Sequence, residues 1–179
     1  VAKLDDTECK NLVRVYRDVN HKVIELWREC DKALESIASS TDKGYYLDKH
    51  KCVHIEKGRI RLPNSMCIYY PDLRWDTSES KSGFVYKSRR GTVGIWGGSV
   101  VENVVQALAR IVIGEQMIKV AREYPVVLTV HDAIVCVAPE EEKDIALEKI
   151  MKIMSTPPEW APDLPVACEG DYADNYGDC

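Results

Sequence analysis

Apolar residues recur at intervals of three and four between residues 6 and 38, the spacing that lines one face of an α-helix. The stripe consists of Leu12, Tyr16, Val19, Val23, Leu26, Cys30, Leu34 and Ile37. Asp6 or Thr7 offers an N-cap oxygen, and Asn20 marks a position for a kink. The pattern predicts one long helix or two consecutive helices, ended by the stretch "SSTDKGYY".

The next segment has the character of β-structure. Residues 52–70, "CVHIEKGRIRLPNSMCIYY", contain two β-rich runs on either side of "LPNS". This arrangement predicts a hairpin with "LPNS" as its turn. Residues 71–91 contain "DTSESKSG" and "KSRRG", and we expect either a long, mobile, partly basic loop or a pair of short strands.

A second helical pattern follows Gly97 and Gly98, where Ser99 could cap a helix from Val100 to about Arg122. Its apolar stripe is Val101, Val104, Val105, Leu108, Val112, Met117 and Ile118. A polar stripe is Asn103, Gln106 and Arg110. These three polar side chains project from one face because they lie three and four residues apart. That face is either a binding surface or an ordinary solvated one.

The stretch "VVLTVHDAIVCVAPEEE" is apolar and β-branched except at its centre. It predicts strands over residues 126–130 and 134–138, flanking a His131-Asp132-Ala133 tip. Pro139 and the acidic residues after it predict the start of another helix, followed by a proline-rich, initially extended tail. The expected fold class is therefore α+β, with a small antiparallel sheet that contains the 126–138 hairpin and packs against the helix from Val100.

Composition narrows the class of protein. A length of 179 residues fits about one domain, and no run of about 18 apolar residues predicts a membrane span. The N-terminal "VAKLDDTECK" lacks the apolar segment of a signal peptide. Because it does not begin with Met, we expect it to be a truncated end rather than a natural start. Seven cysteines without zinc-site spacing favour reduced thiols.

Charge is unevenly distributed along the chain. The net charge is −5, yet residues 43–90 hold eleven Lys or Arg against five acids. Residues 140–179 hold eleven acids against three Lys. A locally basic segment can bind a polyanion even in an acidic chain; the other interpretation is a solvated face and a loop.

Asp132 raises the main chemical question, because a carboxylate interrupts two apolar strands. Asp favours turns, where its side chain can hydrogen-bond its own backbone. A rigid hairpin could equally hold the carboxylate at a fixed place for a hard cation such as Mg²⁺, which takes oxygen ligands. On this motif alone both interpretations remain open.

Five segments, taken together, resemble family A DNA polymerases, the polymerase I group, and in particular its phage branch. "LTVHDAIVCVAPE" resembles motif C, and "WGGSVVENVVQALAR" resembles the palm helix that precedes it. "LPNSMCIYYP" is similar to a phage-branch hairpin, and "VYRDVNHKVIELW" to the helix that leaves the fingers. The tail "STPPEWAPDLPVACEG" completes the series. The resemblance follows the family's order and covers nearly the whole chain.

The resemblance implies a role for each matched residue. Asp132 would hold catalytic Mg²⁺, and His131 would touch the terminal nucleotide of the primer. Gln106, with Asn103 and Arg110, would lie along the primer-template duplex. The implied partners are primer-template DNA, dNTPs and the remainder of the polymerase, with no membrane. The implied location is the cytoplasm, that of the host for a phage protein.

Some positions match the family and others depart from it. Gly97 and Gly98 match, and would let backbone approach backbone or DNA. Ala133 stands where many members have Glu, which puts the rate in doubt more than the mechanism. Ile111 stands where an acid is common, and Trp96 replaces a usual Tyr.

The family's other metal-binding aspartate, and its fingers helix with a Lys and an aromatic residue, have no counterpart here. Phosphoryl transfer uses two ions about 3.5 to 4 Å apart, and one carboxylate cannot hold both. The resemblance therefore implies the C-terminal part of a polymerase, inactive alone, with residues 1–40 near the fingers and residues 41–179 in the palm.

Two alternatives to an active polymerase portion remain for the same residues. One is a palm-like module that grips DNA without chemistry, which Ala133 and Ile111 favour and Asp132 disfavours. The other is a metal-dependent hydrolase with a His-Asp site, but the His and carboxylate clusters of such sites are missing from the sequence.

Overall fold

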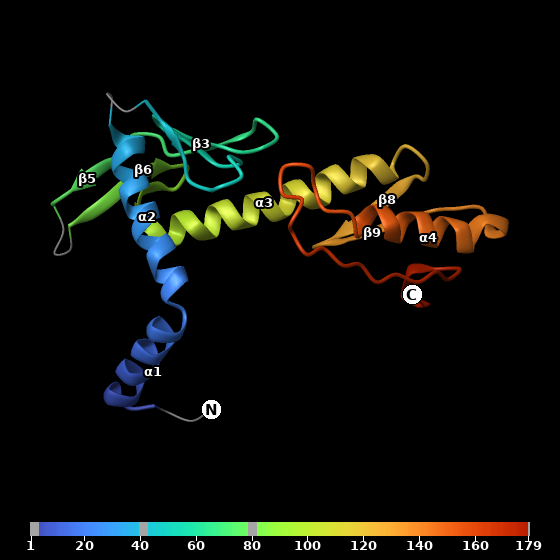
Figure 1. The fold of residues 1–179 in the computed structure, drawn as a ribbon, viewed down its shortest axis with the longest axis horizontal. Coiled ribbons are helices and arrows are strands. Elements are labelled where there is room, and N and C mark those ends of the chain that lie inside the picture. Colours follow the sequence, from blue (N-terminus) through green and yellow to red (C-terminus); the bar gives the residue numbers. More distant parts are fainter. Residues whose placement is uncertain (1–3, 40–42, 79–81, 179) are drawn as a thin grey trace. The chain divides into compact units, whose positions relative to one another are not determined.

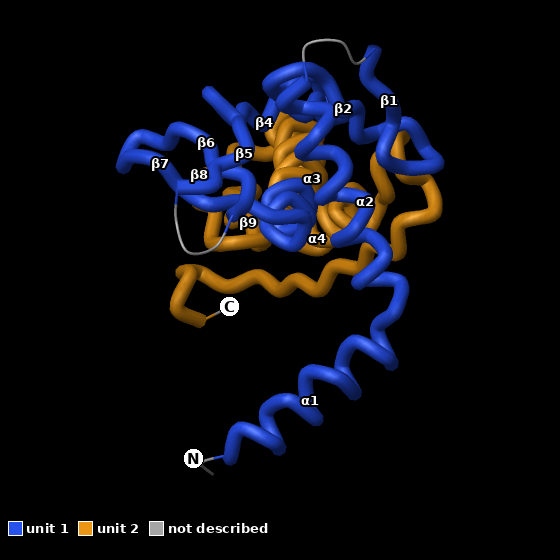
Figure 2. The backbone as a smooth tube through the Cα atoms, turned by 90° about the vertical axis from the view of Figure 1, so that its left-hand side faces the viewer, with its two compact units in different colours: residues 1–105 blue, residues 106–179 orange. Residues whose placement is uncertain are grey.

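The computed structural model describes residues 4–39, 43–78 and 82–178 (Figure 1). The chain forms two compact units, residues 1–105 (unit 1) and 106–179 (unit 2) (Figure 2). The described residues contain four α-helices and three small antiparallel sheets. This combination of helices and antiparallel sheets confirms the α+β class. The assignment of residues 1–40 to a segment near the fingers and of residues 41–179 to the palm stays a prediction.

Unit 1 begins with two helices, which is the second of the two predicted arrangements. Helix α1 spans Asp6–Val19 and helix α2 spans His21–Ala38. Asn20 separates them with a non-helical backbone (φ −101°, ψ 42°), and its side-chain amide donates to the Tyr16 carbonyl at 2.9 Å. A side chain that bonds to the backbone in this way competes with helix continuation, which explains the break.

The N-cap of α1 is Asp5, so the prediction of Asp6 or Thr7 was wrong by at least one position. The Asp5 carboxylate accepts from the backbone N–H groups of Thr7 and Glu8 at 2.7 and 2.8 Å. The Glu8 carboxylate in turn accepts the Asp5 N–H at 2.8 Å. This reciprocal capping box needs an acid three residues after the cap, and Glu8 fulfils that spacing for Asp5 only.

The two helices differ in burial. In α2, Cys30, Ala33, Leu34 and Ile37 are all buried. In α1 no residue is buried, although its apolar residues follow the same helical spacing. Only the second half of the predicted stripe therefore contributes to the core.

A four-stranded sheet follows, in the order β1-β2-β3-β4. Its strands are β1 (Tyr45–Tyr46), β2 (His54–Glu56), β3 (Arg59–Arg61) and β4 (Cys67–Tyr69). The "LPNS" turn is confirmed between β3 and β4. The single run expected before it is wrong, because Gly58 adopts a φ of +76° and reverses the chain between β2 and β3. Ile55 and Ile60 are fully buried on the inner face of this sheet.

Residues after the four-stranded sheet form a second sheet of three strands. These are β5 (Arg74–Asp76), β6 (Gly83–Ser88) and β7 (Gly91–Ile95), paired in that order. The strand alternative predicted for residues 71–91 is therefore confirmed in preference to the loop. Residues 79–81 of "DTSESKSG" lie outside the described residues.

Helix α3 spans Gly97–Val120 and begins three residues before the expected Val100. Ser99 is consequently inside the helix, and its predicted capping role is wrong. The Gly97 N–H donates to the Asp31 carboxylate at 2.5 Å. A Cβ on Gly97 would collide with the Trp27 carbonyl of α2, so only glycine permits this close approach of the two helices.

The buried face of α3 differs from the predicted stripe. Val104 is buried as expected, but Val105 and Ile118 are 56% and 58% exposed. The buried residues of this helix also include Val100, Ile111, Gln116 and Val120. The side-chain amide nitrogen of Gln116 donates to the Met154 carbonyl at 2.7 Å. The amide oxygen of Gln116 is buried without a hydrogen-bond partner among the described residues.

In unit 2 the predicted hairpin is confirmed as β8 (Val126–Val130) and β9 (Ala133–Cys136). Strand β9 begins one residue earlier and ends two residues earlier than expected. Val127 and Leu128 are 59% and 47% exposed. They border an apolar cleft that Met117, Ile118 and Ala121 of α3 also line, so the expected packing of sheet against helix is incomplete.

A short 3-10 turn, η1 (Glu140–Glu142), and helix α4 (Lys143–Met154) complete the regular structure before the tail, which ends in η2 (Tyr176–Asp178). Pro139 precedes η1 rather than α4. The Tyr172 hydroxyl donates to Asp144 at 3.0 Å and fastens the tail to α4. Of the helices described, none is long and apolar enough to cross a membrane.

Candidate functional site

The tip of the β8–β9 hairpin consists of two residues, His131 and Asp132. Val130 pairs with Ala133, so the loop is as short as a hairpin loop can be. His131 has a φ of +54°, in the left-handed region that two-residue hairpin turns require at their first position. Glycine is the residue that adopts this conformation most readily, and histidine is one of the few others found there. The exposed imidazole at this tip is therefore a candidate for a functional contact.

Asp132 is exposed, and its carboxylate accepts no hydrogen bond and forms no ion pair with any described residue. An aspartate that shapes a turn does so by accepting a backbone N–H nearby. No such bond exists at this tip. The turn-forming explanation therefore loses its physical basis, and the carboxylate is left available for a group outside the chain.

The donor set at the tip fits one ligand position of a hard cation. Carboxylate oxygen is the ligand type that Mg²⁺ prefers. Within the described ranges, however, no three His, Cys, Asp or Glu side chains gather to hold a metal. A complete Mg²⁺ site would therefore need further carboxylates in addition to Asp132.

The three polar residues of α3 have different environments. Arg110 and Gln106 are exposed, whereas Asn103 is half-buried. The Asn103 amide donates to the Tyr70 hydroxyl at 3.1 Å. Burial raises the pKa of Tyr70, and the bond gives this buried hydroxyl a partner. Asn103 thus has a structural contact that Arg110 lacks among the described residues.

The structure places the predicted residues on two elements. His131 and Asp132 are adjacent at the hairpin tip, and Asn103, Gln106 and Arg110 follow one another along α3. Asn103 falls in unit 1, and the other four residues fall in unit 2.

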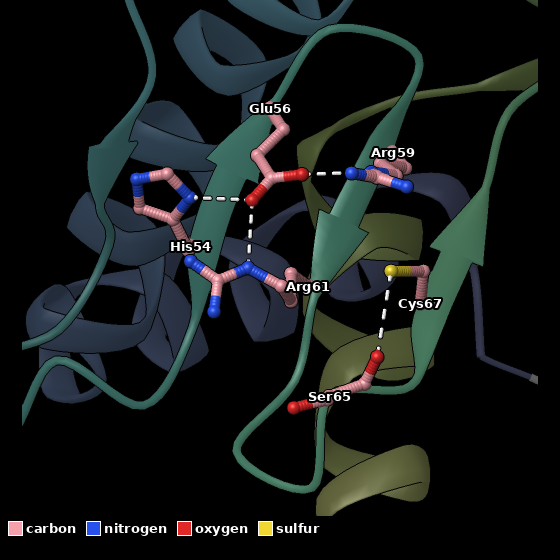
Figure 3. Close-up of polar contacts among 6 residues, drawn as sticks. All are labelled: His54, Glu56, Arg59, Arg61, Ser65 and Cys67. Atoms are coloured by element: carbon pink, nitrogen blue, oxygen red, sulfur yellow. Dashed lines mark hydrogen bonds and ion pairs between the residues drawn. The ribbon is translucent and has the colours of Figure 1, made fainter.

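Sequence reasoning missed a polar cluster around Glu56 in the four-stranded sheet (Figure 3). The Nε–H groups of Arg59 and Arg61 each donate to a different oxygen of Glu56, both at 2.7 Å. His54 Nδ1 lies 2.9 Å from the same carboxylate. Hydrogen bonds from Arg61, His54 and Arg59 lower the pKa of Glu56 to about 2.

The signal for this cluster was present in "HIEKGRIR". Once Lys57 and Gly58 are taken as a turn, alternation pairs His54 with Arg61 and Glu56 with Arg59. Paired residues of neighbouring strands share a face. Treating residues 52–61 as one run concealed this register.

Comparison with known proteins gives one informative similarity. The chain is 27% identical, over 184 aligned residues, to a DNA polymerase of Bacillus phage SP02. The alignment covers 97% of this chain but only 28% of that polymerase. No family model matches the chain, and no solved structure matches it.

Proposed function

We propose that the chain is the C-terminal, palm portion of a family A DNA polymerase, which adds dNTPs to a DNA primer under the direction of a template. The observation that carries the proposal is the exposed Asp132 carboxylate, which lacks a protein partner at the tip of a two-residue hairpin. The similarity to a phage DNA polymerase over 97% of the chain supports it.

In this proposal Asp132 is one ligand of the Mg²⁺ ions that the complete enzyme uses. Bound Mg²⁺ supplies neutralisation of the charge that develops on the transferred phosphoryl group. The hairpin contributes position, because a two-residue loop between paired strands leaves the carboxylate little freedom. His131 is exposed beside it, where its imidazole can hydrogen-bond the terminal nucleotide of the primer.

The exposed side chains of Gln106 and Arg110 contact the primer-template duplex, and Asn103 supports the helix that carries them through its bond to Tyr70. Arg110 neutralises a phosphate, while Gln106 offers both a donor and an acceptor to the minor groove. These contacts hold the duplex without taking part in the chemistry.

A second candidate function is a DNA-binding palm portion that has lost activity. The observation in its favour is Ala133, which is exposed directly beside Asp132 and removes a carboxylate that many family members have there. Both candidates share the DNA contacts, and they differ in the effect of Asp132 on catalysis.

Primer extension tests the proposal. The full-length protein that contains this chain should incorporate dNTPs in the presence of Mg²⁺, whereas the 179-residue chain alone should not. The chain alone should still bind a primer-template duplex, with affinity falling by about 0.9 in log K per log salt for each phosphate neutralised. Failure of the full-length protein to extend a primer would leave the binding module as the better description. A DNA affinity that does not change with salt concentration would contradict both candidate functions.

A further inference from the structure

The four-stranded sheet has an outer face whose composition is unusual for a solvated surface. Strand alternation and register place seven side chains on it: Tyr46, His54, Glu56, Arg59, Arg61, Cys67 and Tyr69. The opposite face carries the fully buried Ile55 and Ile60. We refer to the seven residues as the outer face.

Glu56 fixes the orientation of the two guanidinium groups on the outer face. Each arginine uses its Nε–H for a bond of 2.7 Å to Glu56 (Figure 3). Each also forms a side-chain hydrogen bond with a tyrosine, Arg59 with Tyr69 and Arg61 with Tyr46. The side chains of Arg59 and Arg61 are 43% and 40% exposed. An arginine held in place in this way loses less conformational freedom when it binds an oxyanion than one that moves freely.

Tyrosines flank the two arginines. Tyr69 pairs with Arg59 across the sheet and is 60% exposed. Tyr46 interacts with Arg61 and is 43% exposed, and its ring centroid lies 4.6 Å from that of His54. Exposed aromatic rings beside fixed cations are the surface on which proteins bind single-stranded nucleic acid, because every base has a face that stacks.

The surrounding segment contains more basic than acidic residues. Residues 43–61 contain six Lys or Arg and two acids, Asp48 and Glu56. Asp48 accepts the backbone N–H groups of His50, Cys52 and Val53, so it serves to hold its own loop. Glu56 is occupied by the two arginines. The charge of this segment therefore complements a polyanion.

We infer that the outer face binds single-stranded DNA, with phosphates on Arg59 and Arg61 and bases stacked on Tyr46 and Tyr69. Within the proposed function, on which this identification of the strand rests, the ligand is the unpaired template. Duplex DNA and acidic peptides are the competing ligands, since both also carry negative charge. Neither offers exposed base faces to the tyrosines.

The test is a fluorescence anisotropy titration of a labelled oligothymidylate with the 179-residue chain. The variant Arg59→Gln/Arg61→Gln should bind at least about tenfold more weakly at low salt. Its slope of log K against log salt should fall by about 1.4, the value for two phosphates on a single strand. The control Arg14→Gln/Arg17→Gln removes two exposed charges from α1 and should change the affinity less than about twofold.

A second pair of variants covers the case in which loss of the arginines unfolds the sheet. Tyr69→Phe keeps the ring and should bind within about twofold of the wild type, whereas Tyr69→Leu should bind about tenfold more weakly. Circular dichroism and thermal melting establish that each variant is folded.

Several outcomes would overturn the inference. These are equal binding by the wild type and the Arg59/Arg61 variant, equal losses in that variant and the α1 control, and equal binding by Tyr69→Leu and Tyr69→Phe. Tighter binding of a blunt duplex, or equal competition by polyglutamate, would assign the face to another ligand. A chain that binds oligothymidylate as expected, in a full-length protein that does not extend primers, would refute the proposed function alone.

Discussion

The β2–β3 and β8–β9 hairpins each carry a carboxylate, but these two carboxylates have opposite surroundings. Glu56 accepts hydrogen bonds from Arg59 and Arg61, and lies 2.9 Å from His54 Nδ1. Asp132 has no partner among the described residues. The negative charge of Glu56 is thus used within the fold, and that of Asp132 is not.

These opposite surroundings indicate different roles for the two acids. A carboxylate whose hydrogen bonds are satisfied by its own sheet stabilises or orients that sheet. An exposed carboxylate without partners contributes little to folding, so a ligand outside the chain better explains its place at the tip of a two-residue hairpin. Substitutions that separate folding from activity should therefore affect the two hairpins differently.

The largest effect that the proposed function predicts is that of Asp132→Asn in the full-length protein. The amide keeps the shape of the side chain but loses the charge, and kcat should fall by about 10²- to 10³-fold, as for loss of an electrostatic stabiliser of the transition state. Steady-state primer extension measures this, with Asp174→Asn as an exposed control in the tail. Retention of more than about a tenth of the wild-type kcat, about 1.4 kcal/mol, would rule out a metal-ligand role.

His131→Gly should have the next largest effect. Glycine adopts the positive φ without strain, so folding should survive, while loss of the hydrogen bond to the primer that the proposed function assigns to His131 should lower kcat/KM about tenfold. His131→Asn tolerates the same backbone and keeps a donor, so it should retain more activity than His131→Gly. Primer extension with both variants, beside their melting temperatures, makes the comparison. Equal activity of glycine and wild type would show that the imidazole is dispensable.

Glu56→Gln should act on folding. The amide cannot attract both arginines, and Tm should fall by about 2–4 °C at neutral pH, the size expected for a partly exposed ion-pair network in a chain of this length. Asp132→Asn should leave Tm within about 1 °C of the wild type, because Asp132 has no partner to lose. Thermal unfolding monitored by circular dichroism measures both Tm values. A larger fall in Tm for Asp132→Asn than for Glu56→Gln would contradict a folding role for Glu56 and its absence for Asp132.

The smallest effect is a pH dependence of the same difference. The pKa of Glu56 is about 2 in the fold against an ordinary value of 4.5. A lowered pKa means that its stabilising contribution is fully present above about pH 4.5 and is lost as pH falls through about 2. The Tm difference between wild type and Glu56→Gln should therefore shrink between about pH 5 and pH 2. A difference that stays constant would show that the network does not depend on the charge of Glu56.

The strongest local patterns predicted the fold best. The helical spacing on both sides of Asn20 and the β-branched runs beside His131 identified α1, α2 and the β8–β9 hairpin. The start of α3 could not be read locally, because the Gly97 N–H is held by Asp31, 66 residues earlier in the chain.

The position of the candidate site could be predicted from the sequence, but the hydrogen bonding of its residues could not. A sequence identifies Asp132 at a tip, yet only the three-dimensional arrangement shows that no backbone N–H satisfies it. The Glu56 cluster escaped prediction for the opposite reason. Its members are ordinary surface residues until the Lys57-Gly58 turn brings them into register.

Helix α1 has a practical consequence for work with the chain. Leu12, Val15, Tyr16 and Val19 lie on one side of it and are between 50% and 72% exposed. A contiguous apolar stripe of this kind promotes self-association in water. Purified chain at high concentration should therefore oligomerise, and a polar replacement such as Leu12→Lys should improve its yield and solution behaviour without touching either hairpin.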